Sequence, residues 1–348
     1  MFAMPVMQLI LLGYAATTDV DHLRLAVVDS DKTAASRALI DAYRASRYFE
    51  VSVYADSVAE LGGLIDSGTA RAGLVIPAGY SAELARGETT QVSFVIDGSD
   101  PSVATTVFAA SQAVGQAHSL AVVEQRTGVQ ISTGQAVEVR PRVWYNPEMD
   151  SASFMVPGLI GTVLFFLTAL FTAMSIVRER EQGTIEQLLV TPIKPLELVI
   201  GKIAPYIVVA FINVLEVLLL SVYWFGVPVR GSVGLLLALS AVFLLTSLGI
   251  GIFISSVANS QQEAMLLVFL TLFPSIFLSG FFFPIEAMPT WLQAITYLIP
   301  LRYMLVVIRG IILKGVGLEV LQGQVVALLV FGVSILVLAA SRLRRRLE

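Results

Sequence analysis

Residues 154–177 read FMVPGLIGTVLFFLTALFTAMSIV, and the charged tetrapeptide RERE follows at once at 178–181. An apolar run of this length can cross a bilayer, which takes about 20 residues of α-helix. Similar stretches follow at 203–225, 232–257, 263–283 and 319–341. The pattern predicts an α-helical integral membrane protein.

The N-terminal residues 1–16, MFAMPVMQLILLGYAA, are also apolar, but they are shorter than a full span. A signal peptide would need a basic region before the apolar stretch, and none is present. We therefore expect residues 1–16 to be part of a first transmembrane span whose beginning is missing from this chain. This expectation brings the predicted number of spans to six, the first one truncated.

Charged residues concentrate in one segment of this apolar chain. Hydrophobic residues make up 56% of the 348 positions and charged residues 14%, against about a quarter in ordinary soluble domains. Residues 17–152 nevertheless contain 10 basic and 17 acidic residues. Between about 24 and 145 the strand and helix patterns alternate, which predicts an α/β domain inserted between the first two spans.

The basic residues predict the orientation in the membrane. The last span is followed by SRLRRRLE at 341–348, and basic residues at span ends favour the cytoplasmic side. Counting back through six spans places the loop 178–202 in the cytoplasm and the acidic insert 17–152 outside. The C-terminus is then cytoplasmic, and the chain is a multi-pass protein of the inner membrane.

The stretch 284–315 is apolar but contains Pro284, Pro289 and Pro300. Prolines break helices, so we expect short, broken helices that dip into the outer leaflet and not a single span. Such helices are tolerated at membrane depth where protein buries their backbone.

The segment 178–195 allows three interpretations. It can be a solvated loop, a site for anionic lipid, or a short helix that docks on a protein partner. Four acidic and four basic residues between 176 and 202 argue against lipid attraction. Gly183 would end the preceding helix, and Thr184 with Gln187 would form a capping box for a new one, stopped by Pro192. The loop and the docking helix both remain open on this pattern.

The sequence RERE-x-GT-x-E-x-L-x-x-TP resembles the cytoplasmic signature of type-2 ABC transporter permeases, in the drug-exporter branch with a large extracytoplasmic insert. The stretches LRLAVVDSDKTAASRALIDAYRASRYF, WYNPEMDSASFMVPGLIG and FLSGFFFPIEAMPTWLQAITYLIPLRYMLVVIRGIILKG resemble three further parts of that family. The similarity covers nearly the whole chain. One departure is that the chain begins inside the expected first span.

The resemblance implies a function and partners. The segment 178–195 would couple the permease to a separate ABC ATPase subunit, which would use ATP and magnesium. A second permease copy or a paralogue would complete a dimer in the lipid membrane, and a periplasmic adaptor is a further candidate partner. The coupling residues are Arg178, Glu179, Arg180, Glu181, Gly183, Thr184, Glu186, Leu188, Thr191 and Pro192. Glu179 and Glu181 are expected near basic groups of the partner or of neighbouring spans.

Two further groups are candidate functional residues. Asn213 and Glu216 lie on one face of the span 203–225, and an intramembrane carboxylate is often functional. They could line a substrate path, contact the other permease, or form a structural hydrogen bond. The stretch SGFFFP, comprising Ser279, Gly280, Phe281, Phe282, Phe283 and Pro284, could form an outer hairpin or gate, or pack against lipid.

The sequence contains no motif for metal binding, ATP binding or enzymatic catalysis. There is no cysteine, and His22 and His118 have no metal-ligand spacing, so we expect no metal site. No GxxxxGK[ST] phosphate loop is present, so we expect the chain neither to bind ATP itself nor to act as an enzyme. The net charge of −4 does not favour nucleic acid. We predict a permease subunit of an exporter for hydrophobic or amphipathic substrates. The alternative is a membrane receptor or scaffold that transports nothing.

Overall fold

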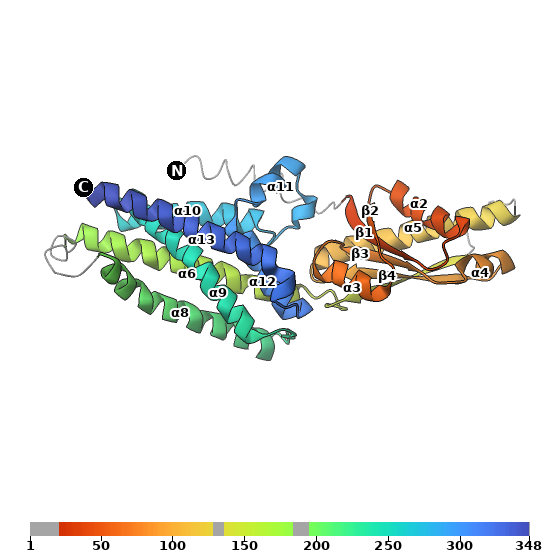
Figure 1. Ribbon diagram of the computed structural model, residues 1–348, viewed down its shortest axis with the longest axis horizontal. Helices are drawn as coiled ribbons and strands as arrows, with labels where there is room; N and C mark the ends of the chain where they lie inside the picture. Colours follow the sequence, from red (N-terminus) through yellow and green to blue (C-terminus); the bar gives the residue numbers. More distant parts are fainter. Residues whose placement is uncertain (1–20, 128–135, 184–194, 348) are drawn as a thin grey trace. The chain divides into compact units, whose positions relative to one another are not determined.

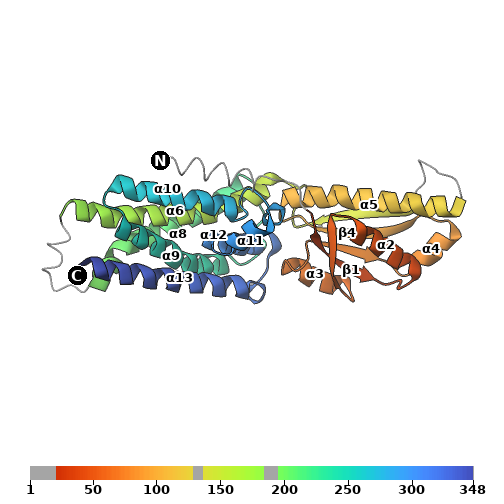
Figure 2. The same ribbon diagram turned by 90° about the horizontal axis from the view of Figure 1, so that it is seen from above.

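The computed structural model describes residues 21–127, 136–183 and 195–347. The described residues fall into two compact units, one within Thr17–Ser151 and one within Ala152–Glu348. The first unit contains a sheet, and the second is helical (Figures 1 and 2). Each is described on its own.

The first unit is an α/β layer structure. Its sheet has the strand order β2-β1-β3-β4-β5, in which β1 is parallel to β2 and β3, β4 is antiparallel to β3, and β5 is parallel to β4. The strands are β1 (Leu23–Asp29), β2 (Phe49–Tyr54), β3 (Ala72–Ile76), β4 (Thr90–Asp97) and β5 (Val137–Trp144). The helices are α2 (Ala34–Ala45), α3 (Val58–Asp66), α4 (Tyr80–Arg86) and α5 (Pro101–Thr127).

Alternate residues of the strands cover opposite faces of the sheet. On one face, Ala26 and Val28 of β1 pack with Leu61 and Ile65 of α3. On the other face, the ring of Tyr43 in α2 packs on Phe49 and Phe94, with centroids 5.6 and 5.3 Å away. The Tyr43 hydroxyl donates a hydrogen bond of 2.9 Å to the carbonyl of Ser111, which ties α2 to α5. The predicted alternation of strands and helices therefore produces a sheet with helices on both faces.

Asp29 ends β1, and Asp31 lies in the turn that follows this strand. The Asp31 carboxylate accepts hydrogen bonds from the Thr33 hydroxyl at 2.5 Å, the Gly79 N–H at 3.1 Å and the Ser81 N–H and hydroxyl, both at 3.2 Å. Burial by itself would raise the pKa of Asp31, but these hydrogen bonds outweigh it and lower the pKa below its ordinary value. Asp31 thereby joins the starts of α2 and α4.

The second unit is built from long apolar helices. Five helices of its described residues are long and apolar enough to cross a membrane. They are α6 (Ser151–Glu181), α8 (Pro195–Tyr223), α9 (Val233–Val257), α10 (Gln261–Leu278) and α13 (Leu318–Leu347). Between α10 and α13 lie the short elements η1 (Ile285–Ala287), α11 (Thr290–Thr296), α12 (Pro300–Arg309) and η2 (Gly310–Lys314).

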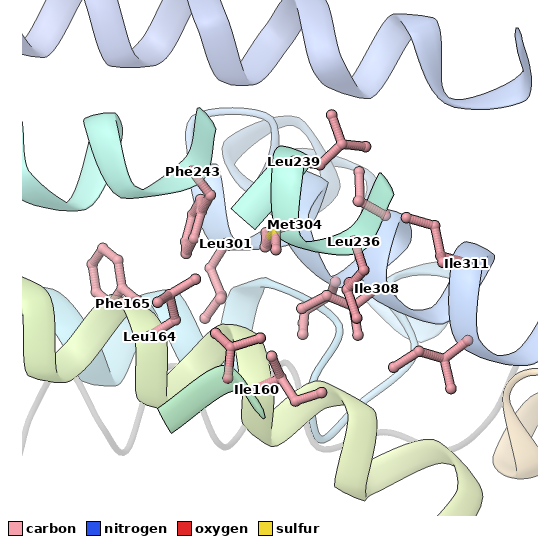
Figure 3. Close-up of a cluster of buried hydrophobic side chains, with 14 of the residues drawn as sticks. Ile160, Leu164, Phe165, Leu236, Leu239, Phe243, Leu301, Met304, Ile308 and Ile311 are labelled. Atoms are coloured by element: carbon pink, nitrogen blue, oxygen red, sulfur yellow. The ribbon is translucent and has the colours of Figure 1, made fainter. Parts of the chain in front are cut away.

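The centre of the helical unit is a single apolar cluster. Ile160, Leu164 and Phe165 of α6 face Leu236, Leu239 and Phe243 of α9 across Leu301, Met304, Ile308 and Ile311 (Figure 3). These side chains come from helices far apart in the sequence. Most of helix α12 is therefore buried in the unit, while Val306 on its other side is 43% exposed.

Helix α13 packs along α9 through small residues. A Cβ on Gly249 would lie 2.8 Å from the Ile335 side chain, and one on Gly332 would lie 3.3 Å from the Thr246 hydroxyl. Small residues let two membrane helices approach closely. The Thr246 hydroxyl also donates a hydrogen bond of 3.3 Å to the Leu328 carbonyl, which adds a polar contact to the pair.

The element boundaries agree with most of the predicted spans and differ from one. The span predicted at 263–283 ends as a helix at Leu278, because Gly280 adopts a left-handed conformation with φ +81°. Helix α8 begins at Pro195, a residue suited to the first turn of a helix, and its candidate span, Ala204–Tyr223, agrees with the prediction 203–225. The last residues of the predicted loop 178–202 therefore belong to α8. In the stretch 284–315, predicted as broken helices, Thr290–Thr296 and Pro300–Lys314 are bent by 84°.

Candidate functional site

The end of α6 is attached to the turn between α9 and α10. The Arg180 guanidinium donates a hydrogen bond to the carbonyl of Ala258, the residue that caps the end of α9. The Glu181 carboxylate accepts hydrogen bonds from the backbone N–H of Gln261 at 3.0 Å and from its side-chain amide at 2.5 Å. Gln261 is the first residue of α10. Two consecutive residues of α6 thus hold both sides of one turn.

The turn itself is closed by its own polar residues. The Ser260 hydroxyl caps α10 by accepting a hydrogen bond of 3.2 Å from the N–H of Glu263. The Glu263 carboxylate accepts a hydrogen bond of 2.7 Å from the N–H of Asn259. Below these groups, Val177 of α6 packs with Ile254 and Ala264. We call Arg180, Glu181, Ala258, Gln261 and Glu263 the α6 junction. It is a polar cap on an apolar helix contact.

The structure describes half of the predicted coupling residues. Arg178, Glu179, Arg180 and Glu181 form the last turn of α6, and Gly183 follows with φ +69°, which ends the helix as expected. Thr184, Glu186, Leu188, Thr191 and Pro192 lie outside the described residues. The hydrogen-bond partner of Glu181 is the neutral Gln261. That Glu179 and Glu181 lie near basic groups of the ATPase or of neighbouring spans stays a prediction. Arg178 is exposed at the surface of this end.

The stretch 279–284 forms a turn after α10 that is tied to α12. The Arg309 guanidinium donates hydrogen bonds to the carbonyl of Gly280 at 2.9 Å and to that of Phe281 at 3.5 Å. The same group lies over the Phe154 ring, 3.6 Å from its centroid. An arginine in an apolar helix unit is stabilised by such carbonyl and aromatic contacts.

The three phenylalanines of this turn have different surroundings. Phe281 is buried at 4% exposure and faces Gly158 of α6, where an added Cβ would lie 2.7 Å from the ring. Phe282 is 43% exposed and packs edge-on against Phe281, with ring centroids 4.7 Å apart. Phe283 is half-buried near Phe277. Ser279 and Pro284 are buried at the two ends of the turn. The turn therefore has one side anchored in the core and one side exposed.

Asn213 and Glu216 of α8, the two candidate residues of this helix, lie near its outward side. Val214 and Leu218 of this helix are buried, whereas Ile212 and Leu219 are each 56% exposed. Glu216 is exposed and Asn213 is half-buried. The Glu216 carboxylate therefore faces away from the helical unit of its own chain.

Sequence reasoning missed Gln261, Arg309 and Phe154 as site residues. Arg309 is one of three basic residues in the apolar stretch 284–315, with Arg302 and Lys314, and a basic residue in such a stretch was a usable signal. Nothing in the sequence pairs it with Phe154, which precedes it by 155 positions. Within the described ranges, no group of three or more histidine, cysteine or acidic residues could hold a metal ion.

A polar junction between the ends of three apolar helices, in a unit that follows a folded insert, suggests a transporter subunit. The comparison with known sequences decides the family. Residues 1–341 match the family model described as ABC-2 family transporter protein. The chain belongs to the ABC-2 transporter family. It is the membrane permease of such a transporter.

Three bacterial relatives match most of this ABC-2 permease. The probable multidrug ABC transporter permease YbhS of Escherichia coli is 31% identical over 99% of this chain and 91% of its own length. The related YbhR permease is 31% identical, covering 93% and 86%. The inner membrane transport permease YhhJ is 28% identical, covering 92% and 85%. Membership of this family implies a partner ATPase and a dimer, and suggests a non-catalytic membrane subunit.

Proposed function

We propose that this permease is the transmembrane subunit of an ATP-driven exporter for hydrophobic or amphipathic molecules. The names of the relatives YbhS and YbhR, which describe probable multidrug permeases, support this substrate class. The chain contains no phosphate-binding loop of its own. ATP and magnesium would therefore be bound and used by a separate ABC ATPase subunit in the cytoplasm.

The α6 junction is the observation that carries this proposal. Residues 178–195 are the proposed contact with the ATPase, and they begin where Arg180 and Glu181 hold the α9–α10 turn. A displacement of this segment would act directly on α6 and, through the two hydrogen-bonded residues, on α9 and α10. The chain itself continues into α8. One contact with the ATPase could thus change the packing of four helices.

The proposed orientation places the α6 junction and the C-terminus inside, and residues 17–152 outside. The arginines at 342 and 344–346 support this orientation by the positive-inside rule. The chain lacks cysteine, so Ser67→Cys and Ser341→Cys each provide one label site, both exposed. A membrane-impermeant thiol reagent added to spheroplasts should label Cys at 67 and spare Cys at 341. The reverse pattern would contradict the orientation.

The outward Glu216 suggests where a second permease or the substrate path lies. An isolated carboxylate facing lipid near the middle of a span is costly. A neighbouring permease copy or paralogue, or a hydrated path between two permeases, would give Glu216 and Asn213 a polar environment. The insert 17–152 would contact a periplasmic adaptor or guide the exit of substrate.

The test of coupling is ATP hydrolysis by the purified complex in lipid. Glu181→Ala removes both hydrogen bonds to Gln261, and Arg180→Ala removes the bond to Ala258. Either change should lower substrate-stimulated hydrolysis several-fold, with membrane insertion unchanged. Glu319→Ala is the matched control, because Glu319 is exposed in the first turn of α13, far along the chain from the α6 junction. Full stimulated hydrolysis in both junction variants would exclude the coupling role.

A further inference from the structure

An apolar groove runs between α9, α10 and α13. It has a volume of about 350 Å³, within the range of small-molecule pockets, about 300–1,000 Å³. Its walls include Phe253 and Val257 of α9, Leu267 and Leu270 of α10, and Ile335 and Leu338 of α13. Among the described residues that line it, Thr271 is the polar one, and its hydroxyl already donates a hydrogen bond of 2.9 Å to the Leu267 carbonyl. The lining of the groove therefore favours a hydrocarbon chain as its ligand.

The groove opens to the outside of the helical unit. Leu338 is 58% exposed, Leu270 40% and Phe253 36%. Along α9 the lining runs from Ile250 to Val257, which is about 10 Å of helix axis at 1.5 Å per residue. The hydrocarbon core of a bilayer is about 30 Å thick. The groove thus fits within one leaflet and is too short for a second spanning helix to follow along its length.

A cation lies at one end of the groove. Arg342 is one helical turn beyond Leu338 on α13, and its guanidinium lies over the Phe253 ring, 5.8 Å from the centroid. Its side chain is exposed. Two carboxylates of this end, Glu181 and Glu263, are hydrogen-bonded to Gln261 and Asn259. A hydrocarbon groove ending at an exposed guanidinium is complementary to a molecule with an apolar chain and an anionic head.

We propose that this groove binds one acyl chain of an anionic phospholipid, whose phosphate pairs with Arg342. Arginine binds phosphate through two parallel hydrogen bonds, which suits this role. The lipid would fill the space between α9, α10 and α13 next to the α6 junction. Its assignment to the cytoplasmic leaflet rests on the proposed orientation of the permease. The binding of the lipid to the groove does not depend on this orientation.

The test uses tryptophan fluorescence and brominated lipids, because a bromine quenches a tryptophan that it contacts. In the full-length permease, Trp144, Trp224 and Trp291 are replaced by Phe, and one tryptophan is introduced at Leu338 or Leu270, both exposed enough to accept it. Val337→Trp is the matched control, since Val337 is 61% exposed on α13 and does not line the groove. The bilayer contains brominated phosphatidylglycerol or brominated phosphatidylcholine.

Quenching at positions 338 and 270 should favour phosphatidylglycerol about fivefold, the effect of roughly one basic residue on anionic lipid. The ratio of quenching by phosphatidylglycerol to quenching by phosphatidylcholine should be near one at position 337. Arg342→Gln should bring the ratio at 338 to the control value, and Arg342→Lys should keep much of it. Three results would each overturn the proposal. One is equal quenching by both lipids at position 338, and another is a preference for phosphatidylglycerol that survives Arg342→Gln. The third is no quenching at all, because protein covers the groove. This measurement needs no ATPase, so its failure would leave the exporter proposal untouched.

Discussion

The guanidinium of Arg309 lies 3.6 Å from the centroid of the Phe154 ring, and it donates hydrogen bonds to the carbonyls of Gly280 and Phe281. These contacts join the start of α6, the end of α12 and the turn at 279–284. Buried Phe281 is held on the core side of this turn, whereas Phe282 remains exposed. Arg309 therefore sets the position of this turn, for which the sequence allows an outer hairpin or gate, or packing against lipid.

Replacing Arg309 should loosen this turn. Arg309→Ala removes two charge-assisted hydrogen bonds, each worth about 1.5–3 kcal/mol, and the aromatic contact. We expect the thiol-labelling rate of a cysteine at Phe282 to rise several-fold in this variant. Arg302→Ala is the control from the same helix, because Arg302 contacts Tyr297 and Thr296 instead. An unchanged rate at position 282 would mean that Arg309 does not hold the turn.

A glycine between α6 and α9 should tolerate no side chain. A Cβ on Gly251 would lie 2.7 Å from the Thr172 Cβ and 2.8 Å from the Ala169 carbonyl oxygen. Because backbone cannot move aside cheaply, Gly251→Ala should destabilise the helical unit by about 1–3 kcal/mol. Gly323→Ala is the matched control in α13, where no atom lies within 4 Å. It should be neutral or slightly stabilising. Thermal unfolding of the detergent-solubilised permease would distinguish the two variants.

Residues 17–151 should fold without the helical unit, because they contain their own sheet and buried clusters. Far-ultraviolet circular dichroism and a cooperative thermal transition would test this. An unfolded fragment at neutral pH would show that the insert depends on the rest of the chain.

Asp31 should make the stability of this fragment depend on pH. Hydrogen bonds hold the folded-state pKa of Asp31 below its ordinary value of about 3.9. The contribution of Asp31 to the free energy of unfolding is therefore complete above its unfolded-state pKa. It is lost as the pH falls through the lower folded-state pKa. Asp31→Asn should lower the melting temperature at pH 7, and the difference from the parent fragment should shrink toward pH 3. A difference that is the same at both pH values would exclude this role.

The sequence predicts the elements well where periodicity and turn residues agree. The strands around Leu23–Asp29 and Phe49–Tyr54 have such signals, and so do the long apolar helices. The end of α10 was missed because hydropathy continues through FLSGFFF, while the backbone turns at Gly280. Helix α8 extends beyond the start of the predicted span 203–225, where Glu197 and Lys202 lower the hydropathy of its first turns.

The contacts of the candidate site could not be predicted in the same way. Arg180 and Ala258 are separated by 78 positions, and Arg309 and Gly280 by 29. Such pairs depend on how the helices pack, and periodicity reports only which face of each helix is apolar. The charged turn at 178–181 could be identified from the sequence, but its partner turn at 258–261 could not.

The carboxylate of Glu216 should have a role that leucine cannot replace. If a polar path or a second permease covers it, Glu216→Leu should lower transport strongly, and Glu216→Gln should lower it less, since the amide still forms hydrogen bonds. Leu219→Gln is a control for adding polarity at an exposed position one turn away. Normal transport by the Glu216→Leu variant would show that this carboxylate has no role in transport.

The central claim is that an ABC ATPase contacts this permease at the end of α6. A photoreactive amino acid at Gln182, which is exposed directly after the α6 junction, would test it in intact cells. A second one at Leu318, 49% exposed at the start of α13, is the control. We predict that the probe at Gln182 forms an adduct with an ABC ATPase subunit identified by mass spectrometry and that the probe at Leu318 does not. Adducts of the ATPase at Leu318 and none at Gln182 would contradict the claim.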